Sequence, residues 1–556
     1  MNVEEVQRRL WEQSQEHREH RESTTPLFPT NPYEQRVRNL MDLMHNPHWL
    51  RFAAERVLKR SYHKAPGVDG VTTRKFRKGI EGKLEALRLE LKRGTYQPQP
   101  LRRVMIPKAN GKLRGLGIPC LRDKIVQEAM RMALEPIFEV DFHDHSYGFR
   151  PHRSTHHAVF RCQQLMRSGF TWVIEGDVKA CFDEISHQAI LKVVREKVQD
   201  NKFLDLIRRF LKAGVEVEGV VQPTEKGVPQ GGVISPLLAN AVLNKLDWFL
   251  HRQGKHGRLM HWAHVNKRPN VRFVRYADDW CVFVTRGSRT YAEDLREKIR
   301  GFLQGECGLE LSVEKTHVTH VRDGFEFLGF SLTQGVGRNG KVIPKIRIGP
   351  QAVANLRQRL NDAIRRRPHQ ESVAMRIQRG SAVVRGWSEY YRIAHNFPSI
   401  AGTLDHHAFW TAVKAICRKH DITTAQCVKK YGSTGVIRID ESCQLAKFSG
   451  IKVKLDYRRP EPYEPGKAAY ETDTELEVNF ARFNERSRFG NLDLKWKTLQ
   501  RDHYQCRGCG KSVTDQDSQM DHIEPVSHFA SFALASTEDN LQTLCLDCHW
   551  QKHYAI

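Results

Sequence analysis

Residues 273–284 read FVRYADDWCVFV, two apolar, β-prone arms on either side of Tyr276-Ala277-Asp278-Asp279. The pattern predicts a buried hairpin with adjacent carboxylates at its tip. A plain polar turn is the alternative, and a Tyr-x-Asp-Asp match alone is expected by chance in about one chain in twenty of this length. Burying two like charges is costly unless a cation or base compensates them, so the apolar arms favour a metal site.

A two-metal site for phosphoryl transfer needs carboxylates from at least two segments of the chain. The best upstream partner is TWVIEGDVKACFDEI (171–185), in which an apolar strand ends on Asp177 and Asp183 follows six residues later. With this segment paired to the hairpin, the chain resembles a polymerase palm, in which one aspartate at a strand end and another in a hairpin turn hold two Mg²⁺ ions. One ion would activate the primer 3′ hydroxyl and the other the leaving pyrophosphate.

Length and charge indicate a multidomain protein that binds a polyanion. The 556 residues exceed what one core usually supports, and two to four domains are expected. The net charge of +25 and pI near 9.6 favour nucleic acid over an anionic membrane or mere solubilisation. No run approaches the roughly 18 apolar residues of a membrane span, and the first residues have no apolar signal core, so a cytoplasmic protein is expected.

A basic helical region is predicted after a long mixed segment of strands and helices. Residues 341–400 hold twelve Lys and Arg against three acidic residues. Trp387, Tyr390 and Tyr391 interleave with these arginines, which suits phosphate contact plus base stacking, although a solvated helix face is the alternative. The stretch DYRRPEPYEPGKAAYETDTELE (456–477) is rich in proline and charge and predicts a linker.

Four of the twelve cysteines form a pattern near the C-terminus, Cys506-x-x-Cys509 and Cys545-x-x-Cys548. Two such pairs provide the Cys₄ set of a tetrahedral structural Zn²⁺, which would supply folding energy to a small module. Disulfides are the alternative, but the chain shows no sign of secretion. The other eight cysteines stand singly, as reduced core cysteines do.

Taken in order, these motifs resemble those of group II intron-encoded proteins, which are reverse transcriptases and maturases with a C-terminal HNH endonuclease. The resemblance covers nearly the whole chain, and the ordered set is far more specific than any single piece. It rests on KAPGVDGVT (64–72), RRVMIPKANGKLRGLGIPCLRDKIVQ (102–127), DVKACFD (177–183), KGVPQGGVISPLLAN (226–240), YADD (276–279), GLELSVEKT (308–316), FEFLGF (325–330), RGWSEYY (385–391), QMDHIEPVS (519–527), STEDNLQTLC (536–545) and CHWQKHY (548–554).

The resemblance implies an α+β multidomain protein with a right-hand polymerase. The expected parts are a basic helical N-terminal extension, fingers and palm, a helical thumb or maturase domain, a DNA-binding region with a linker, and an HNH module of the ββα-metal fold with a Cys₄ zinc site. Their expected bounds are, in that order, 1–60, 61–345, 346–420, 421–480 and 481–556.

By the same resemblance, Asp177 and Asp278 are the principal Mg²⁺ ligands, with the Val178 carbonyl helping and Asp279 adjacent. These oxygen ligands suit a hard, octahedral cation. We expect Asp183 to support the fold instead of binding metal.

Three basic residues match positions that handle the triphosphate in this family. Lys108 and Arg114 match the fingers positions that neutralise the incoming nucleotide, because developing charge on pyrophosphate needs preorganised cations. Lys112 is the alternative, as a solvated turn lysine. Lys315 matches a lysine proposed to protonate the leaving pyrophosphate, with an exposed loop lysine as the alternative.

Three further residues match the pocket around the nucleotide. Phe182 matches the sugar gate, an aromatic ring that would clash with a ribose 2′ hydroxyl, although a core phenylalanine is the alternative. Gln230 and Gly231 match the template and nucleotide-pocket motif, where glycine lets the backbone approach closely.

In the C-terminal module, the resemblance makes His522 the general base, Asp521 and His549 ligands of a catalytic Mg²⁺ or Mn²⁺, and Asn540 a residue that orients the base or closes the loop. His553 lies four residues after His549 and is either a third ligand or a solvent-facing histidine.

The family implies one integrated activity. The protein binds its intron RNA, assists splicing, stays on the excised lariat as a ribonucleoprotein, and extends a cleaved DNA target with dNTPs in a prokaryotic cytoplasm, at the nucleoid when bound to target DNA. A nuclease tethered to a polymerase delivers its product as primer at high effective concentration. The alternative is an RNA-binding maturase whose polymerase is dispensable. Retron-type enzymes, diversity-generating enzymes and a pure homing nuclease fit less well.

Overall fold

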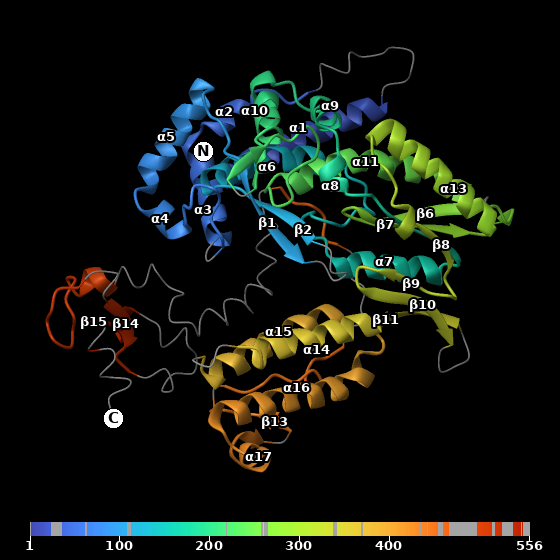
Figure 1. Cartoon of the computed structure of the whole chain (residues 1–556). Helices are drawn as coiled ribbons and strands as arrows, with labels where there is room; N and C mark the ends of the chain where they lie inside the picture. Colours follow the sequence, from blue (N-terminus) through green and yellow to red (C-terminus); the bar gives the residue numbers. More distant parts are fainter. Residues whose placement is uncertain are drawn as a thin grey trace. The chain divides into compact units, whose positions relative to one another are not determined.

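The computed structural model (Figure 1) describes residues 2–23, 36–61, 64–107, 113–217, 219–256, 259–260, 265–336, 342–367, 371–433, 435–441, 443–453, 460–465, 498–513, 518–524, 538–545 and 548. The chain divides into two compact units, Met1–Gly466 and Lys467–Ile556. No helix in the described ranges combines the length and apolar content that a bilayer crossing requires.

The helices of the first unit are α1 (Val3–Ser23), α2 (Leu40–Met44), α3 (Pro47–Arg60), α4 (Thr73–Arg77), α5 (Ile80–Arg93), α6 (Leu121–Glu139), α7 (Thr155–Arg167), α8 (Cys181–Glu184), α9 (His187–Arg195), α10 (Asn201–Leu211), α11 (Ser235–Gln253), α13 (Arg289–Phe302), η1 (Leu303–Cys307), η2 (Val313–Lys315), α14 (Pro350–Ile364), α15 (Val373–Tyr391), α16 (Phe397–His420) and α17 (Thr424–Tyr431). Its strands are β1 (Leu101–Pro107), β2 (Leu113–Ile118), β3 (Trp172–Asp177), β4 (Val215–Val217), β5 (Val220–Gln222), β6 (Asn270–Tyr276), β7 (Asp279–Thr285), β8 (His317–His320), β9 (Phe325–Phe327), β10 (Phe330–Val336), β11 (Val342–Ile348), β12 (Gly432–Ser433) and β13 (Val436–Ile437).

A four-stranded antiparallel sheet in the order β6-β7-β3-β8, here called the central sheet, lies between two hydrophobic cores. Alternate side chains of β7 enter different cores, because successive residues of a strand point to opposite faces. Trp280 and Val282 enter one core, and Cys281 and Phe283 enter the other. The predicted buried hairpin is therefore confirmed. Its strands are apolar on both faces because helices cover both.

Gly176 allows a large ring to lie across the central sheet. Gly176 pairs with Trp280 in the β3–β7 register, and a Cβ added to Gly176 would lie 2.0 Å from the indole ring. Only glycine fits there. The indole therefore lies directly on the strand residue that precedes Asp177.

A second sheet in the order β2-β1-β4-β5 begins with the predicted basic hairpin of β1 and β2. Strand β1 also pairs with β4 in parallel. Part of this sheet is exposed, with Val104, Met105 and Ile106 between 37% and 50% accessible. The sheet is thus open to solvent where the resemblance expects fingers.

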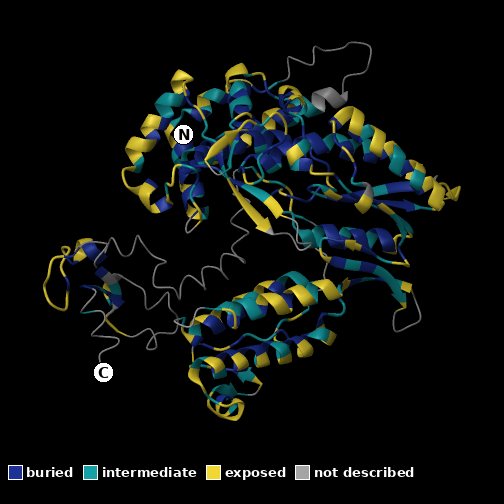
Figure 2. Cartoon of the chain, in the orientation of Figure 1, coloured by how far each residue is buried: buried dark blue, intermediate teal, exposed yellow. Residues whose placement is uncertain are grey.

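Helices α14, α15 and α16 follow the strands β9, β10 and β11 and confirm the predicted helical region (Figure 1). The described parts of these helices carry both buried and exposed residues in Figure 2, as helices with one face on a core do.

The expectation that Trp387, Tyr390 and Tyr391 stack on nucleic acid is wrong. Trp387 is only 9% accessible, and Tyr390 and Tyr391 pack against the second hydrophobic core. The Tyr390 ring stacks on Phe330 at 5.2 Å, and its hydroxyl donates to the Leu328 carbonyl at 2.7 Å. These rings fasten α15 to the β9–β10 turn, because large apolar rings with one polar end stabilise such a joint.

The second unit contains β14 (Ser518–His522) and β15 (Leu541–Cys545), which pair in antiparallel fashion, and η4 (Glu538–Asn540), which immediately precedes β15. A small core that includes Leu499, Val513 and Leu544 lies beside the cysteines. Cys506 and Cys545 belong to this core, so the cysteines and the apolar side chains pack together.

Candidate functional site

Three aspartates meet at one edge of the central sheet. Asp177 ends β3 and lies opposite Asp279, the first residue of β7, in the β3–β7 register. Asp278 and Ala277 form the turn between β6 and β7, and Ala277 has the left-handed φ of 58°. The sequence placed these carboxylates at a strand end and a hairpin tip, and the structure brings the two segments together.

The electrostatics of this edge favour a bound cation. Desolvation and the charges of Asp278 and Asp177 together raise the pKa of Asp279 to about 6. Burial also raises the pKa of Asp278, while Arg114 and Lys315 act in the opposite direction. Carboxylates that repel one another in this way are the ligands a hard divalent ion stabilises, so these residues fit Mg²⁺.

Lys315 lies at the same edge. Its Nζ donates to Asp177 Oδ2 at 2.7 Å, and this hydrogen bond raises the pKa of the lysine. The side chain is otherwise 66% exposed. A protonated amine therefore lies beside the carboxylates, as a proton donor to a product would have to.

Val178 continues the chain beyond Asp177 and forms an antiparallel bridge with Leu311. Its side chain is 1% accessible, and the Asp177 carbonyl accepts from the Ser312 N–H at 2.9 Å. The backbone around both predicted ligands is therefore held by the segment that leads to Lys315.

Arg114, Gln230 and Asp183 are joined by side-chain hydrogen bonds. Asp183 is the residue expected only to support the fold. The Arg114 Nε donates to Gln230 Oε1 at 2.6 Å, and the Gln230 Nε2 donates to Asp183 Oδ2 at 3.0 Å. Asp183 thereby fixes which end of the Gln230 amide faces the arginine. Lys108 and Lys112 lie outside the described residues.

Gly231 approaches the backbone of strand β2 closely, while its expected approach to template and nucleotide stays a prediction. Gly231 has a φ of 116°, and a Cβ there would lie 2.2 Å from the Gly117 carbonyl oxygen. The Gly117 N–H donates to the Gln230 carbonyl at 2.7 Å. Strand β2 and the loop with Gln230 are thus held backbone to backbone.

Phe182 lies between Asp177 and Gln230 in the sequence, and its side chain is half-buried. Its carbonyl accepts from the Val228 N–H at 2.6 Å, and its ring meets Phe149 edge to face at 6.4 Å. The ring contacts the first core without being enclosed by it, which suits a side chain that also borders a ligand.

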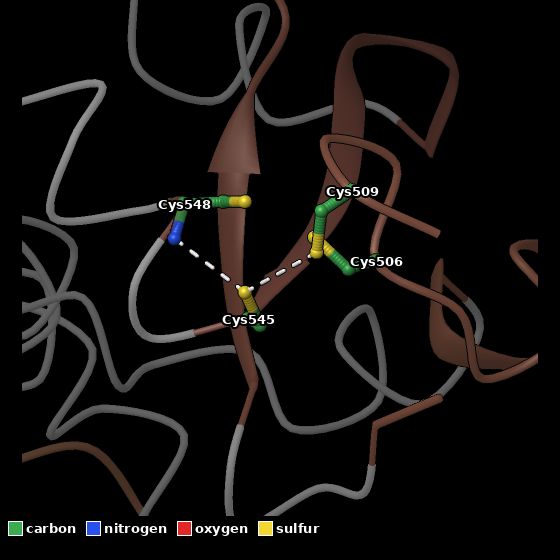
Figure 3. A group of neighbouring side chains, drawn as sticks. All are labelled: Cys506, Cys509, Cys545 and Cys548. Carbon is green, nitrogen blue, oxygen red and sulfur yellow. Dashed lines mark hydrogen bonds between the residues drawn. The ribbon is translucent and has the colours of Figure 1, made fainter. Parts of the chain in front are cut away.

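The four C-terminal cysteines converge as predicted (Figure 3). They are the one set of three or more His, Cys, Asp or Glu in the described residues whose ligand atoms all lie within 4.8 Å of one another. The Cys509 and Cys545 sulfurs are 3.8 Å apart. A tetrahedral ion with Zn–S bonds of about 2.3 Å requires sulfurs about 3.8 Å apart, so the geometry fits Zn²⁺.

The backbone prepares this site for charged sulfur. Burial opposes ionisation of Cys506, but hydrogen bonds from the backbone of Cys545, Cys509 and Gly508 lower its pKa to about 6. A Cβ on Gly508 would lie 3.1 Å from the Cys548 sulfur. The thiolate is the metal-binding form of cysteine.

Asn540 closes the segment between β14 and β15. Its Oδ1 accepts from the Glu524 N–H at 2.8 Å, and its Nδ2 donates to the Glu524 carbonyl at 3.2 Å. Asp521 is 6% accessible on β14, paired with Gln542. His522 ends β14, but its side chain lies outside the described residues, as do His549 and His553.

A buried group of four hydrogen-bonded residues behind the aspartates was not predicted from the sequence. It consists of Arg275, Asp247, Asn240 and Gly148. Its signal was present, because Arg275 is a charged residue within the otherwise apolar arm FVRY and had to find a buried partner.

Three protein families match the chain in succession. Residues 106–332 match reverse transcriptase (RNA-dependent DNA polymerase), residues 353–432 match the group II intron maturase-specific domain, and residues 506–555 match HNH endonuclease. The chain is thus a mixed α/β multidomain protein with a reverse transcriptase domain and an HNH domain.

Individual relatives are similar to the chain over long stretches. Protein YkfC of Escherichia coli (strain K12) is 44% identical over 328 residues, 55% of this chain and 86% of that protein. Group II intron-encoded protein LtrA of Lactococcus lactis subsp. cremoris is 28% identical over 569 residues, 86% of this chain and 89% of that protein. The putative COX1/OXI3 intron 2 protein of Saccharomyces cerevisiae is 27% identical over 71% of this chain and 53% of its own.

Proposed function

The chain belongs to the group II intron-encoded proteins, reverse transcriptases and maturases with an HNH endonuclease domain, and we propose that Asp177, Asp278 and Asp279 form its polymerase centre. The protein is an RNA-directed DNA polymerase, an intron splicing maturase and a DNA endonuclease that binds intron RNA and DNA. A maturase with dispensable polymerase is not favoured, because two enzyme families match beside the maturase domain.

The observation that carries this proposal is the meeting of three carboxylates from two segments at one sheet edge, where desolvation raises the pKa of Asp278 and of Asp279. Asp177 and Asp278 hold the metal with help from the Val178 carbonyl, and Asp279 adds charge beside them. Bound Mg²⁺ would activate the primer 3′ hydroxyl and offset the charge of the leaving pyrophosphate. Lys315 gives a proton to the pyrophosphate, for which its position against Asp177 suits it.

The nucleotide pocket lies between the hairpin of β1 and β2 and the loop with Gln230. Arg114, together with Lys108, neutralises the triphosphate of the incoming dNTP. Gln230 exchanges its bond to Arg114 for contacts with template and nucleotide, while Asp183 keeps its amide oriented. Phe182 packs beneath the deoxyribose.

The proposed domains of the chain have the expected bounds. Residues 61–345 provide fingers and palm, 346–420 the thumb and maturase domain, 421–480 a DNA-binding region and linker, and 481–556 the nuclease, with 1–60 as a basic extension. The net charge of +25 supports extensive phosphate contact.

In the nuclease, His522 removes a proton from the attacking water, and Asp521 with His549 holds a divalent metal. Mg²⁺ or Mn²⁺ would stabilise the charge that develops on the scissile phosphate. Asn540 keeps the end of β14 against the start of β15, so that Asp521 and His522 stay at a fixed distance from the zinc site. The Cys₄ set holds Zn²⁺.

These activities combine in target-primed reverse transcription by a ribonucleoprotein of protein and intron lariat. The intron RNA enters one DNA strand, the nuclease cuts the other, and the new 3′ end is extended with dNTPs. Because both enzymes belong to one chain, the cut end reaches the polymerase at high effective concentration.

The test of the polymerase proposal is primer extension by the full-length protein on an RNA template with an annealed DNA primer, dNTPs and Mg²⁺. We expect cDNA that reaches the template end, and none when Mg²⁺ is withheld. A protein that binds the primer–template in a filter assay, with or without its intron RNA, yet makes no cDNA would contradict the proposal.

Phe182→Ala is expected to lower the preference for dTTP over UTP by about 10–100-fold, because the shape of an apolar pocket contributes about that much selectivity. The measurement is the ratio of kcat/KM for the two nucleotides on one template. Phe182→Tyr keeps a ring at the same place and should retain most of the preference. If alanine leaves the ratio unchanged while extension persists, Phe182 is a packing residue only.

A further inference from the structure

A fully buried ion pair lies directly behind the turn that carries Asp278. The Arg275 Nε and Nη2 donate to the two carboxylate oxygens of Asp247 at 2.7 and 2.5 Å, and both side chains are 0% accessible. Asp247 lies on α11, whose residues contact β6. A forked pair of this kind fixes the plane of the guanidinium group.

The remaining guanidinium nitrogen reaches the catalytic turn. The Arg275 Nη1 donates to the Ala277 carbonyl at 2.9 Å and to Asn240 Oδ1 at 2.8 Å. The Ala277 carbonyl belongs to the rigid peptide plane that joins Ala277 to Asp278. Arg275 therefore holds the backbone unit from which the Asp278 side chain departs.

A second contact confines the same turn. A Cβ on Gly148 would lie 2.3 Å from the Ala277 nitrogen, so the two backbones are in direct contact. The Gly148 carbonyl accepts from Asn240 Nδ2 at 2.8 Å, and the Tyr147 N–H donates to the Arg275 carbonyl at 2.8 Å. Asn240 thus joins the guanidinium group to the segment that touches the turn.

Ala277 needs such support. Its φ of 58° lies in the left-handed region, which is strained for a residue with a Cβ and persists only when the surroundings impose it. The turn also brings the charges of Asp278 and Asp279 next to each other and near Asp177, where they repel one another. Without the bond to its carbonyl, the Ala277–Asp278 peptide loses one of the contacts that hold it against both.

We propose that Arg275, held by Asp247 and Asn240, is a positioning residue that fixes the Ala277–Asp278 peptide plane and so sets the direction of the Asp278 carboxylate for nucleotide addition. Arg275 itself touches neither metal nor substrate. The inference rests on the proposed polymerase function and adds to it the structural origin of the Asp278 geometry.

Arg275→Lys tests whether the forked guanidinium group of Arg275 is required. Lysine keeps the charge opposite Asp247 but cannot hold a carboxylate and also reach the Ala277 carbonyl in one plane. We expect kcat for single-nucleotide addition to fall about 10–100-fold with the dNTP KM within about 3-fold, because a misplacement near 1 Å costs about that much rate. Amide exchange of the peptide that covers the turn, measured without metal, should become at least about 10-fold faster.

The double variant Arg275→Met with Asp247→Leu separates positioning from fold. It replaces the buried ion pair by apolar side chains of similar volume, which buried pairs often tolerate without loss of stability. We expect a Tm near that of the wild type, but kcat still reduced and the turn still exchanging fast. A double variant with wild-type kcat and wild-type exchange would overturn the proposal, even if Arg275→Lys alone is unstable.

Arg131→Lys is the matched control. Arg131 forms a comparably buried pair with Glu128 at 2.9 Å on α6, and neither residue bonds to the turn. Its replacement should lower Tm without changing kcat or turn exchange. An equal fall in kcat for the control would overturn a role specific to Arg275. If wild-type protein makes no cDNA, the proposed function fails, and turn exchange still decides whether Arg275 holds the peptide plane.

Discussion

Replacing Asp278 with alanine is expected to reduce RNA-templated primer extension by at least about 10³-fold, because a metal ligand in phosphoryl transfer supplies several kcal/mol of transition-state stabilisation and each 1.36 kcal/mol is tenfold in rate. Asp278 lies in the two-residue turn between β6 and β7, next to Asp279, which pairs with Asp177. Full-length cDNA per enzyme, quantified at saturating dNTP, gives the measurement.

Two controls make this result specific. Asp294→Ala removes an exposed carboxylate from α13 of the same unit and should leave extension within about 2-fold, since isolated surface substitutions rarely matter. Affinity for the primer–template should be retained in Asp278→Ala. Extension by Asp278→Ala at more than about a tenth of the wild-type rate would remove Asp278 from the list of principal ligands.

The second large effect concerns the cysteines. Cys545→Ser is expected to abolish DNA nicking, because a structural Zn²⁺ site contributes folding energy to the small module that holds it. Primer extension should stay within about 2-fold of wild type, because the polymerase residues lie in a separate compact unit. Bound zinc per chain by atomic emission, together with nicking of a labelled duplex, provides the readout.

Cys443→Ser serves as the matched substitution. Cys443 is 3% accessible in the first unit and belongs to no described ligand set. It should retain the zinc content and the nicking rate of the wild type. Should Cys545→Ser keep its zinc and still cut DNA, the Cys₄ assignment is wrong.

Local sequence patterns were enough to predict the pieces of both sites. Asp177 at a strand end, Asp278 in a hairpin tip and the paired cysteines each follow from short-range spacing and apolar periodicity. That the two aspartate segments are adjacent came from the resemblance and from the chemical need for two carboxylate sources, and the β3–β7 register confirms it.

Contacts between distant segments could not be predicted in this way. The bonds of Gln230 to Arg114 and Asp183 join residues 116 and 47 positions apart. The aromatic rings of RGWSEYY were assigned to nucleic acid because they alternate with arginines, yet they pack against Phe330 and Leu328. A surface ring and a ring at an internal joint have the same local pattern, and only tertiary packing separates them.

The alternation of β7 between two cores has a consequence for how the chain can change in length. Inserting one residue between Asp279 and Val284 would turn every β7 side chain after the insertion to the opposite face of the central sheet. Side chains that normally enter the core of Trp280 would then face the core of Phe283. Insertion scanning should therefore find that this strand accepts no added codon, whereas the β4–β5 hairpin, whose β5 residues Val220 and Val221 are exposed, should accept a peptide tag.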